Sequence, residues 1–449
     1  MTDRPTYVRP TLIRHRSGAM NKFGAGARQR VQPTIDGVDI EALVEAYGSP
    51  LFVYSERRLR RAVRSLREAL ALRYPRTALA WSYKTCSLDA VCRVFEEEGS
   101  LAEVVSAMEL DKAVRQGVPL SRVVYNGPYK TEASLRLALA GGARVHLDHF
   151  DELATVERIA QDLGIRSRVA LRLSVDVGGA ARWDRFGFHL DSGQAWDAVR
   201  RLVHGDVLEL SGLHCHIGTY VSDPGAYREA AKKLVAFMGR LHDELGIRID
   251  TLDLGGGFAS QAQLKAQHLS ADSSTPTFAE YAEALTEPLA ELAARPDPPL
   301  LILEVGRALV DDAGSLITTA VGCKRLADGR QGVVVDAGVN LLYTSAWYRH
   351  SVSPTAEIPG APEPTTLFGP LCMNIDVVAD HLLLPPVSPG RRFVLHPVGA
   401  YNLTQSMQFI HLRPAVAMIG PDGQHACIRR AEVLEDLVGP ERLAPWQAG

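Results

Sequence analysis

The stretch ALAWSYKTCSL, residues 78–88, ends an apolar run with a lysine that is able to react. Lys84 is one of only eight lysines among the 49 lysine and arginine residues of the chain. An amine held in an apolar pocket is partly deprotonated and then attacks carbonyl carbons. A lysine after an apolar strand is nevertheless more often a surface charge with a buried stem, so its neighbours in the fold must decide its role.

Other chemically capable groups follow later apolar runs. An amine, an imidazole, a glycine turn, a carboxylate and a guanidinium together suit a phosphorylated aromatic aldehyde. The amine binds the aldehyde, and glycine N–H groups approach the phosphate closely because no Cβ blocks them. The residues that supply these groups are Lys84, His214, His216, Thr219, Gly255, Gly256, Gly257, Glu304 and Arg307.

Each of these pieces alone has a simpler explanation. The three glycines also suit a plain tight turn, and Glu304 and Arg307 also suit an ion pair at a strand end. His214 and His216 stand two residues apart, so they share one face of a strand, where histidines often bind metals. The sequence shows no converging third ligand, so we predict packing or ring stacking and no metal site. The ordered combination carries the functional argument.

The elements around these residues predict a (β/α)₈ TIM-type barrel. Short apolar runs alternate with helical patterns, among them helices expected over 131–140, 151–163 and 223–245. About eight such units favour a closed barrel over an open doubly wound sheet. Because chemistry in such barrels collects at the carboxyl ends of the strands, the fold would gather the candidate residues on one face.

After Arg307 the pattern changes to strands and loops without regular helices, which predicts a second, mainly β domain of sandwich type. We expect the barrel over residues 47–312 and the β domain from 36–46 together with 313–449. Residues 1–35 are expected to form an N-terminal extension, and the proline-rich residues 353–366 an irregular loop.

Composition excludes several classes of protein. The 449 residues are 46% hydrophobic and 22% charged, with a formal net charge of −3, so nucleic acid and acidic membranes are not expected partners. The N-terminus lacks the apolar core of a signal peptide, and no run reaches transmembrane length. The six cysteines form no CxxC pair. We therefore expect a cytoplasmic protein with a small-molecule substrate.

A dozen motifs in order resemble the fold type III pyridoxal phosphate-dependent decarboxylases, the family of diaminopimelate decarboxylase and eukaryotic-type ornithine decarboxylase. The resemblance runs from about Gly48 to Pro414 and implies the alanine racemase type of fold, a barrel plus a β domain, with pyridoxal 5'-phosphate as cofactor. The motifs are SPLFVYSERRLR, WSYKTC, EVVSAMEL, NGPYK, LDHFDEL, DRFGF, GLHCHIGT, LDLGGGF, EVGR, VDAGVN, GPLCMNID and GAYNLTQSMQF.

The resemblance also implies a role for each matching residue. Lys84 would bind the cofactor's aldehyde, His216 would stack on its ring, and Glu304 would keep the ring nitrogen protonated so that the ring accepts electrons. The phosphate would be held by Thr219, Gly255, Gly256, Gly257, Gly306, Arg307 and Tyr401.

Cys372 would return a proton to Cα after carbon dioxide leaves, and the family supplies this cysteine from the neighbouring subunit. A homodimer with shared active sites would follow. The simpler alternative is that Cys372 is a buried small residue.

Two departures from the family concern the substrate. Met373 stands where the family has glutamate or aspartate, and a thioether cannot pair with an ammonium. Thr344, with Tyr348 nearby, stands roughly where diaminopimelate decarboxylases carry an arginine. We therefore predict decarboxylation of an amino acid or an amino-acid-derived intermediate with a less charged or larger distal end.

Three alternatives remain open. The first is a true diaminopimelate or ornithine decarboxylase. The second is an amino-acid racemase, disfavoured because racemases of this fold place an arginine where Glu304 stands. The third is an inactive regulatory homologue, disfavoured because the cofactor residues are all present.

Overall fold

The computed structural model describes residues 30–178, 183–265 and 274–447. Their contacts divide them into two compact units, each described by itself. The barrel unit comprises the described residues of 57–261 and 274–312, and the β unit those of 30–56, 262–265 and 313–447. Residues 1–29 of the expected N-terminal extension lie outside the described residues.

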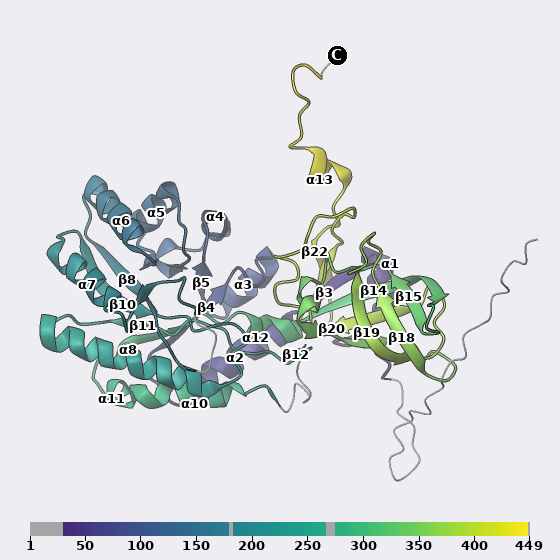
Figure 1. The fold of residues 1–449 in the computed structure, drawn as a ribbon, viewed down its shortest axis with the longest axis horizontal. Helices are drawn as coiled ribbons and strands as arrows, with labels where there is room; N and C mark the ends of the chain where they lie inside the picture. Colours follow the sequence, from purple (N-terminus) through teal and green to yellow (C-terminus); the bar gives the residue numbers. More distant parts are fainter. Residues whose placement is uncertain (1–29, 179–182, 266–273, 448–449) are drawn as a thin grey trace, which may run out of the picture. The chain divides into compact units, whose positions relative to one another are not determined.

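Eight parallel strands close the barrel, which confirms the predicted fold class (Figure 1). Closure comes from β13, which pairs with β4 through Leu301 and Thr77, while β10 joins β8 to β11. The strands are β4 (Thr77–Ser82), β5 (Leu101–Val104), β6 (Val123–Tyr125), β7 (Arg144–Leu147), β8 (Ser167–Ser174), β10 (Leu208–His214), β11 (Thr251–Asp253) and β13 (Leu300–Leu303).

The connecting helices lie outside the strands (Figure 1). In α2, the residues Leu59, Val63, Leu66 and Leu70 repeat at helical spacing and are all buried. The principal helices are α2 (Glu56–Ala71), α3 (Asp89–Glu97), α4 (Ala107–Arg115), α5 (Glu132–Ala140), α6 (Phe150–Leu163), α7 (Gln194–His204), α8 (Pro224–Leu245) and α10 (Phe278–Thr286).

Side-chain caps set where these helices begin. The Thr131 hydroxyl accepts the N–H of Ser134 ahead of α5, and Asp223 accepts the N–H of Gly225 ahead of α8. A capping residue has extended rather than helical backbone, so both helices start one residue later than the sequence pattern predicts. None of the helices among the described residues is long and apolar enough to cross a membrane.

The β unit is built on a sheet with the order β19-β18-β15-β14-β3-β21-β22, and β20 pairs with both β14 and β17. Its strands are β3 (Leu51–Ser55), β14 (Gly314–Arg325), β15 (Gln331–Val335), β17 (Ser351–Pro354), β18 (Glu363–Phe368), β19 (Val377–Leu384), β20 (Arg392–His396), β21 (Val416–Ile419) and β22 (His425–Arg429). Helix α1 (Ile40–Tyr47) packs into the core of this unit through Ile40, Leu43 and Val44.

Two local features differ from the sequence pattern. Strand β3, which falls inside the range expected for the barrel, pairs with β14 and β21 and so belongs to the β unit. The proline-rich segment 353–366 is not one irregular loop, because β17 takes its first residues and β18 its last. Edge positions and strand ends tolerate proline, which explains how both strands accommodate it.

Candidate active site

A polar layer covers an apolar layer inside the barrel. Ala80, Leu101, Val124 and Ile302 form a buried cluster from four strands. Two residues further along the same chain segments stand Ser82, Glu103, Asn126 and Glu304. Because side chains two residues apart share a face of a strand, the barrel interior changes from apolar to polar in one step. The carboxyl ends of the strands therefore hold a group of buried polar side chains.

Lys84 is directed into this polar layer. Its Nζ donates to Glu103 Oε2 over 2.5 Å and lies 3.4 Å from Ser82 Oγ. The Glu103 side chain is completely buried, while that of Lys84 is 35% exposed. Burial raises the pKa of Glu103 to about 7, with the charge of Glu304 adding to the shift and Lys84 opposing it. Lys84 is thus an amine with a buried partner and not a free surface charge.

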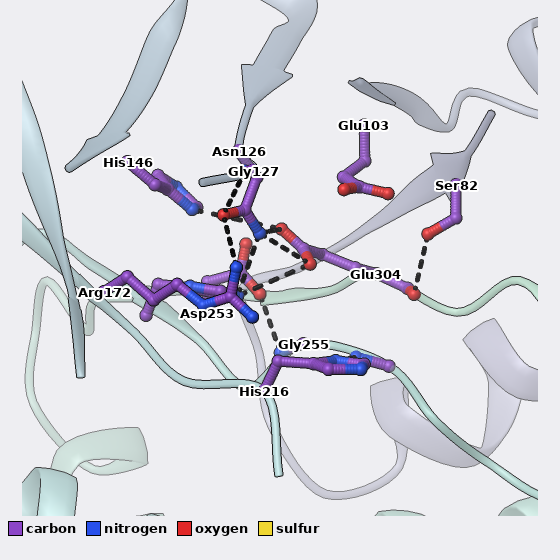
Figure 2. Close-up of polar contacts among 12 residues, drawn as sticks. Ser82, Glu103, Asn126, Gly127, His146, Arg172, His216, Asp253, Gly255 and Glu304 are labelled. Atoms are coloured by element: carbon purple, nitrogen blue, oxygen red, sulfur yellow. Dashed lines mark hydrogen bonds and ion pairs between the residues drawn. The ribbon is translucent and has the colours of Figure 1, made fainter. Parts of the chain in front are cut away.

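Glu304 is held by three uncharged side chains. Asn126 Nδ2 donates to both of its carboxylate oxygens over 3.2 Å each. His214 Nε2 lies 3.4 Å from Oε2, and His146 Nδ1 lies 3.9 Å from Oε1. Figure 2 shows Asn126 and His146 directed toward this carboxylate.

These surroundings fix the charges in the layer. Burial would raise the pKa of Glu304, but the hydrogen bond from His214 and the charge of Lys84 outweigh it and hold that pKa well below its usual value. Burial also lowers the pKa of His214 and of His146, so both imidazoles stay neutral. The pKa of Asp253 is raised well above its usual range by burial and by the charge of Glu304. Glu304 is therefore the ionised carboxylate, and Asp253 is a neutral acid beside it.

The two histidines of the sequence pair separate in the structure: His214 joins His146 and Glu304, whereas His216 does not. His146, His214 and Glu304 each offer a ligand atom, and these atoms lie within 4.8 Å of one another. His146 comes from β7, far from His214 in sequence, so strand closure is what brings them together. Asn126 Nδ2 donates to both Glu304 oxygens, so hydrogen bonds already join the members of this cluster.

His216 lies apart from that cluster, against residues Gly255–Gly257, which we call the glycine loop. Its Nδ1 accepts the N–H of Gly256 at 3.1 Å, and the Trp183 ring meets it edge-on at 5.3 Å. Burial, followed by the charges of Arg172 and Lys84, lowers the pKa of His216 to about 3. A neutral imidazole with one nitrogen fixed in this way presents its ring face for stacking.

The fold itself requires glycine at two positions of this loop, whether or not a ligand is bound. A Cβ on Gly256 would lie 2.1 Å from the Glu304 carbonyl oxygen, and one on Gly257 would lie 2.1 Å from the Gly218 carbonyl oxygen. Gly257 also has φ of 94°, a region that disfavours other residues. The loop therefore packs directly against the backbone that carries Glu304.

The remaining candidate groups of the barrel unit adjoin this loop. The Val221 N–H donates to the Gly257 carbonyl oxygen over 2.8 Å, which places the exposed Thr219 near the glycines. The guanidinium of Arg307 lies 5.9 Å from the ring centroid of Tyr220. A Cβ on Gly306 would lie 2.1 Å from Thr85 Oγ1, just after Lys84.

The other candidate residues belong to the β unit. Thr344 is buried, and its hydroxyl donates to Asn402 Oδ1 over 2.9 Å. Tyr348 is buried in β16 (Tyr348–Arg349), and Tyr401 has φ of 66°. Cys372 is exposed within this unit, which argues against the buried alternative, and Met373 is half-buried.

Sequence reasoning missed five members of the polar layer. They are Glu103, Asn126, His146, Arg172 and Asp253, and each stands at the carboxyl end of a barrel strand. The signal that reveals Glu103 and Asn126 is a polar residue two places after a buried apolar one, repeated in neighbouring strands.

Residues 56–311 match the family model of the pyridoxal binding domain of pyridoxal-dependent decarboxylases. The chain belongs to this family. The decarboxylase is 30% identical to diaminopimelate decarboxylase from Bacillus subtilis over 90% of this chain and 94% of the relative. The diaminopimelate decarboxylase structure from M. jannaschii superposes with a TM-score of 0.85 at 26% identity, covering 93% of this chain and 98% of that one. A complex of the M. jannaschii enzyme with L-lysine gives a TM-score of 0.83 at 27% identity, covering 92% and 96%.

These findings confirm the resemblance and the predicted cofactor, pyridoxal 5'-phosphate, and identify the decarboxylase as a carboxy-lyase. The polar layer fits that cofactor. Lys84 supplies an amine, His216 a neutral ring, and Gly255–Gly257 a loop of close backbone approach. Glu304 supplies a buried anion whose nearest partners are neutral, and such an anion suits a protonated ring nitrogen.

Proposed function

We propose that this decarboxylase removes the α-carboxylate of an amino acid, or of an amino-acid-derived intermediate, whose distal end is less charged or larger than that of diaminopimelate. The observation that carries the proposal is the hydrogen bonding of Thr344. Its hydroxyl is buried and donates to Asn402 Oδ1, and it carries no positive charge that could pair with a distal carboxylate. Met373 likewise offers no anion to a distal ammonium.

The proposed roles divide the site into cofactor binding and proton transfer. Lys84 binds the cofactor aldehyde, His216 supports the ring, and Glu304 pairs with the ring nitrogen. The bound cofactor supplies an electron sink for the pair left when carbon dioxide departs. The phosphate falls to the glycine loop with Thr219, Gly306, Arg307 and Tyr401.

We propose in addition that Lys84 gives its proton to Glu103 before the cofactor binds. A lysine attacks an aldehyde as the free amine, so its proton must leave. Glu103 Oε2 is the nearest acceptor at 2.5 Å, and its raised pKa makes it able to hold that proton near neutral pH. Glu103 thereby prepares the amine for cofactor binding.

Protonation at Cα falls to Cys372, contributed by the neighbouring copy in a cytoplasmic homodimer with shared active sites. Its exposure in the β unit supports this role, since a thiol must reach the substrate to deliver a proton. The homodimer rests on the family resemblance of the GPLCMNID segment.

A second candidate is diaminopimelate decarboxylase itself. The relatives from B. subtilis and Methanocaldococcus jannaschii, 30% and 28% identical, carry that name. If this candidate is correct, residues other than Met373 and Thr344 must bind the distal end of diaminopimelate.

A carbon dioxide release screen separates the two candidates. The panel contains diaminopimelate, ornithine, lysine, arginine, glutamate and citrate-conjugated diamino acids. We expect the highest kcat/KM with a substrate whose distal end is masked or enlarged. Release from diaminopimelate well above all others would refute the altered specificity.

A further inference from the structure

We propose that His214 and His146 are positioning residues that hold the Glu304 carboxylate in one orientation. His214 does so through a neutral N–H donor, and His146 through a ring that packs against His214 and faces the other carboxylate oxygen. The inference rests on the proposed pairing of Glu304 with the cofactor's ring nitrogen and explains how that pairing is maintained. It concerns two histidines on different strands, β7 and β10, that take no direct part in the proposed reaction.

The geometry places one imidazole at each carboxylate oxygen. His214 Nε2 faces Oε2 at 3.4 Å, and His146 Nδ1 faces Oε1 at 3.9 Å. The two imidazoles contact each other, with ring centroids 4.7 Å apart. All three side chains are at most 2% exposed, so water does not compete for these contacts. Rotation of the carboxylate in either direction would bring it against a ring.

Asn126 fixes which atoms donate. Its Oδ1 accepts the N–H of Gly127 at 2.8 Å, so its Nδ2 must point toward Glu304. His214 Nε2 faces the same anion and is favoured as the protonated nitrogen of the neutral ring. Among the described residues, Nδ1 of His214 and Nδ1 of His146 have no hydrogen-bond partner, so His146 contributes ring contact and not a hydrogen bond. His214 Nε2 also lies 3.3 Å from Asn126 Nδ2, which donates to the same carboxylate.

The backbone under this cluster is fixed as well. Lys130 is buried, and its Nζ donates to the carbonyl oxygens of His146 and Gly127 over 2.9 and 2.8 Å. Glu152 Oε1 accepts from the same amine at 2.7 Å and balances its charge. Lys130 thus ties β7 to the segment that carries Asn126, and the donors arrive at Glu304 already positioned.

Because both histidines are neutral, the Glu304 carboxylate keeps its negative charge available for the ring nitrogen of the cofactor. The charged or titratable groups around the pair are Lys84, Glu103, Lys130, Arg172, Asp253 and Glu304. With Lys130 and Arg172 already cationic, a further charge on either imidazole would be repelled, and it would cancel the charge of Glu304. The neutral donors of His214 and Asn126 hold the carboxylate and leave its charge for the ring nitrogen.

The test uses holoenzyme loaded with cofactor that carries ¹⁵N in the pyridine ring, whose chemical shift reports protonation of that nitrogen. We compare His214→Phe with His214→Gln, and His146→Phe with His146→Asn. Phenylalanine keeps a planar ring without N–H, whereas each amide places an N–H near the original nitrogen. His242→Phe, at an exposed position of α8, is the control.

We expect His214→Phe to shift the ¹⁵N signal toward the unprotonated form and to lose cofactor about 10- to 100-fold faster on dilution, as expected for a lost hydrogen bond to a charged group. His214→Gln should stay near wild type because it keeps a donor, and His146→Phe should do so because it keeps the packed ring. His146→Asn, which removes that ring, should shift the signal part of the way. Equal behaviour of the phenylalanine and amide variants, or a stoichiometric metal ion retained by the holoenzyme, would overturn the inference.

Two further measurements keep the outcomes separate. Glu304→Gln must itself shift the ¹⁵N signal; if it does not, the proposed role of Glu304 fails first. If Glu304→Gln shifts the signal and the histidine variants do not, only this inference fails. In unmodified holoenzyme with ¹⁵N-labelled histidine, the side chains of His146, His214 and His216 should all titrate below the ordinary range of histidine. Fewer than three such histidines would contradict neutral donors even if a variant does not fold.

Discussion

Lys84 Nζ lies 2.5 Å from Glu103 Oε2, and Glu103 is the more deeply buried partner. The pair joins the end of β4 to the end of β5, since Ser82 and Glu103 are in register. A buried carboxylate next to a half-buried amine stabilises the charged lysine in the cofactor-free protein and receives its proton when the amine must react. Lys84 is therefore prepared for its task by the neighbouring strand.

Replacing Lys84 should abolish covalent cofactor attachment. Purified wild-type protein is expected to carry a chromophore that borohydride reduces and fixes to the chain, and Lys84→Ala should lack it, because the variant removes the amine that is directed at Glu103 in the polar layer. Absorbance and mass spectrometry after reduction measure the result. Lys232→Ala, on the exposed face of α8, is the matched control. A chromophore that survives in Lys84→Ala would remove Lys84 from the site.

Glu103 should make the stability of the cofactor-free protein fall as pH rises. Its folded pKa of about 7 lies above the usual glutamate value, so the folded protein keeps a proton that the unfolded chain has lost. Stability is then highest below about pH 4.3, the ordinary glutamate pKa, and declines as pH approaches about 7. Urea unfolding at about pH 5 and pH 8 should show a smaller decline in Glu103→Gln than in wild type. An unchanged decline would show that Glu103 is already ionised at the lower pH.

Gly256→Ala should damage the site, whereas Gly239→Ala should not. The new Cβ of the first variant meets the Glu304 carbonyl oxygen at 2.1 Å, so the loop and the Glu304 backbone must separate. We expect a loss of several kcal/mol of stability or of cofactor binding, within the range for overpacking against backbone. Gly239 lies in α8 with open space around it, and alanine there should stabilise by about 0.5–1 kcal/mol. Thermal unfolding of both holoenzymes gives the comparison.

The sequence predicts the barrel well because its signals are local. Apolar runs, helical periodicity and capping residues such as Thr131 and Asp223 each act within a few residues. The strand ends then follow, and with them Lys84, His216, the glycine loop and Glu304.

What escapes prediction depends on contacts between distant segments. Glu103 and His146 lie in strands of four residues, where one polar position does not reveal whether it faces the barrel interior. Strand β3 is buried at every position, so no alternation indicates which sheet it joins. Only the paired register places Glu103 beside Lys84 and His146 beside Glu304.

Thr344→Val should lower stability without changing substrate preference. The variant removes the hydroxyl that donates to Asn402 Oδ1 and leaves a buried acceptor with one partner fewer, which costs about 1–3 kcal/mol. Urea unfolding measures that loss, and the carbon dioxide release panel measures preference. Thr404→Val, at an exposed position, is the control. A changed order of substrates in Thr344→Val would show that the hydroxyl contacts the substrate after all.

Met373→Glu should shift preference toward substrates with a distal ammonium. Met373 follows Cys372 in a turn held by Asp376, which accepts the N–H groups of Leu371 and Val339 over 2.7 and 2.8 Å. Because neither of these hydrogen bonds involves the side chain of residue 373, a glutamate at this position should be tolerated. A carboxylate pairs with an ammonium where a thioether cannot, and one charged hydrogen bond corresponds to a gain of about tenfold or more in kcat/KM for diaminopimelate or lysine. Met373→Gln separates charge from size, since it is similar in length and neutral. Equal kcat/KM values in the Glu and Gln variants would place residue 373 away from the distal group.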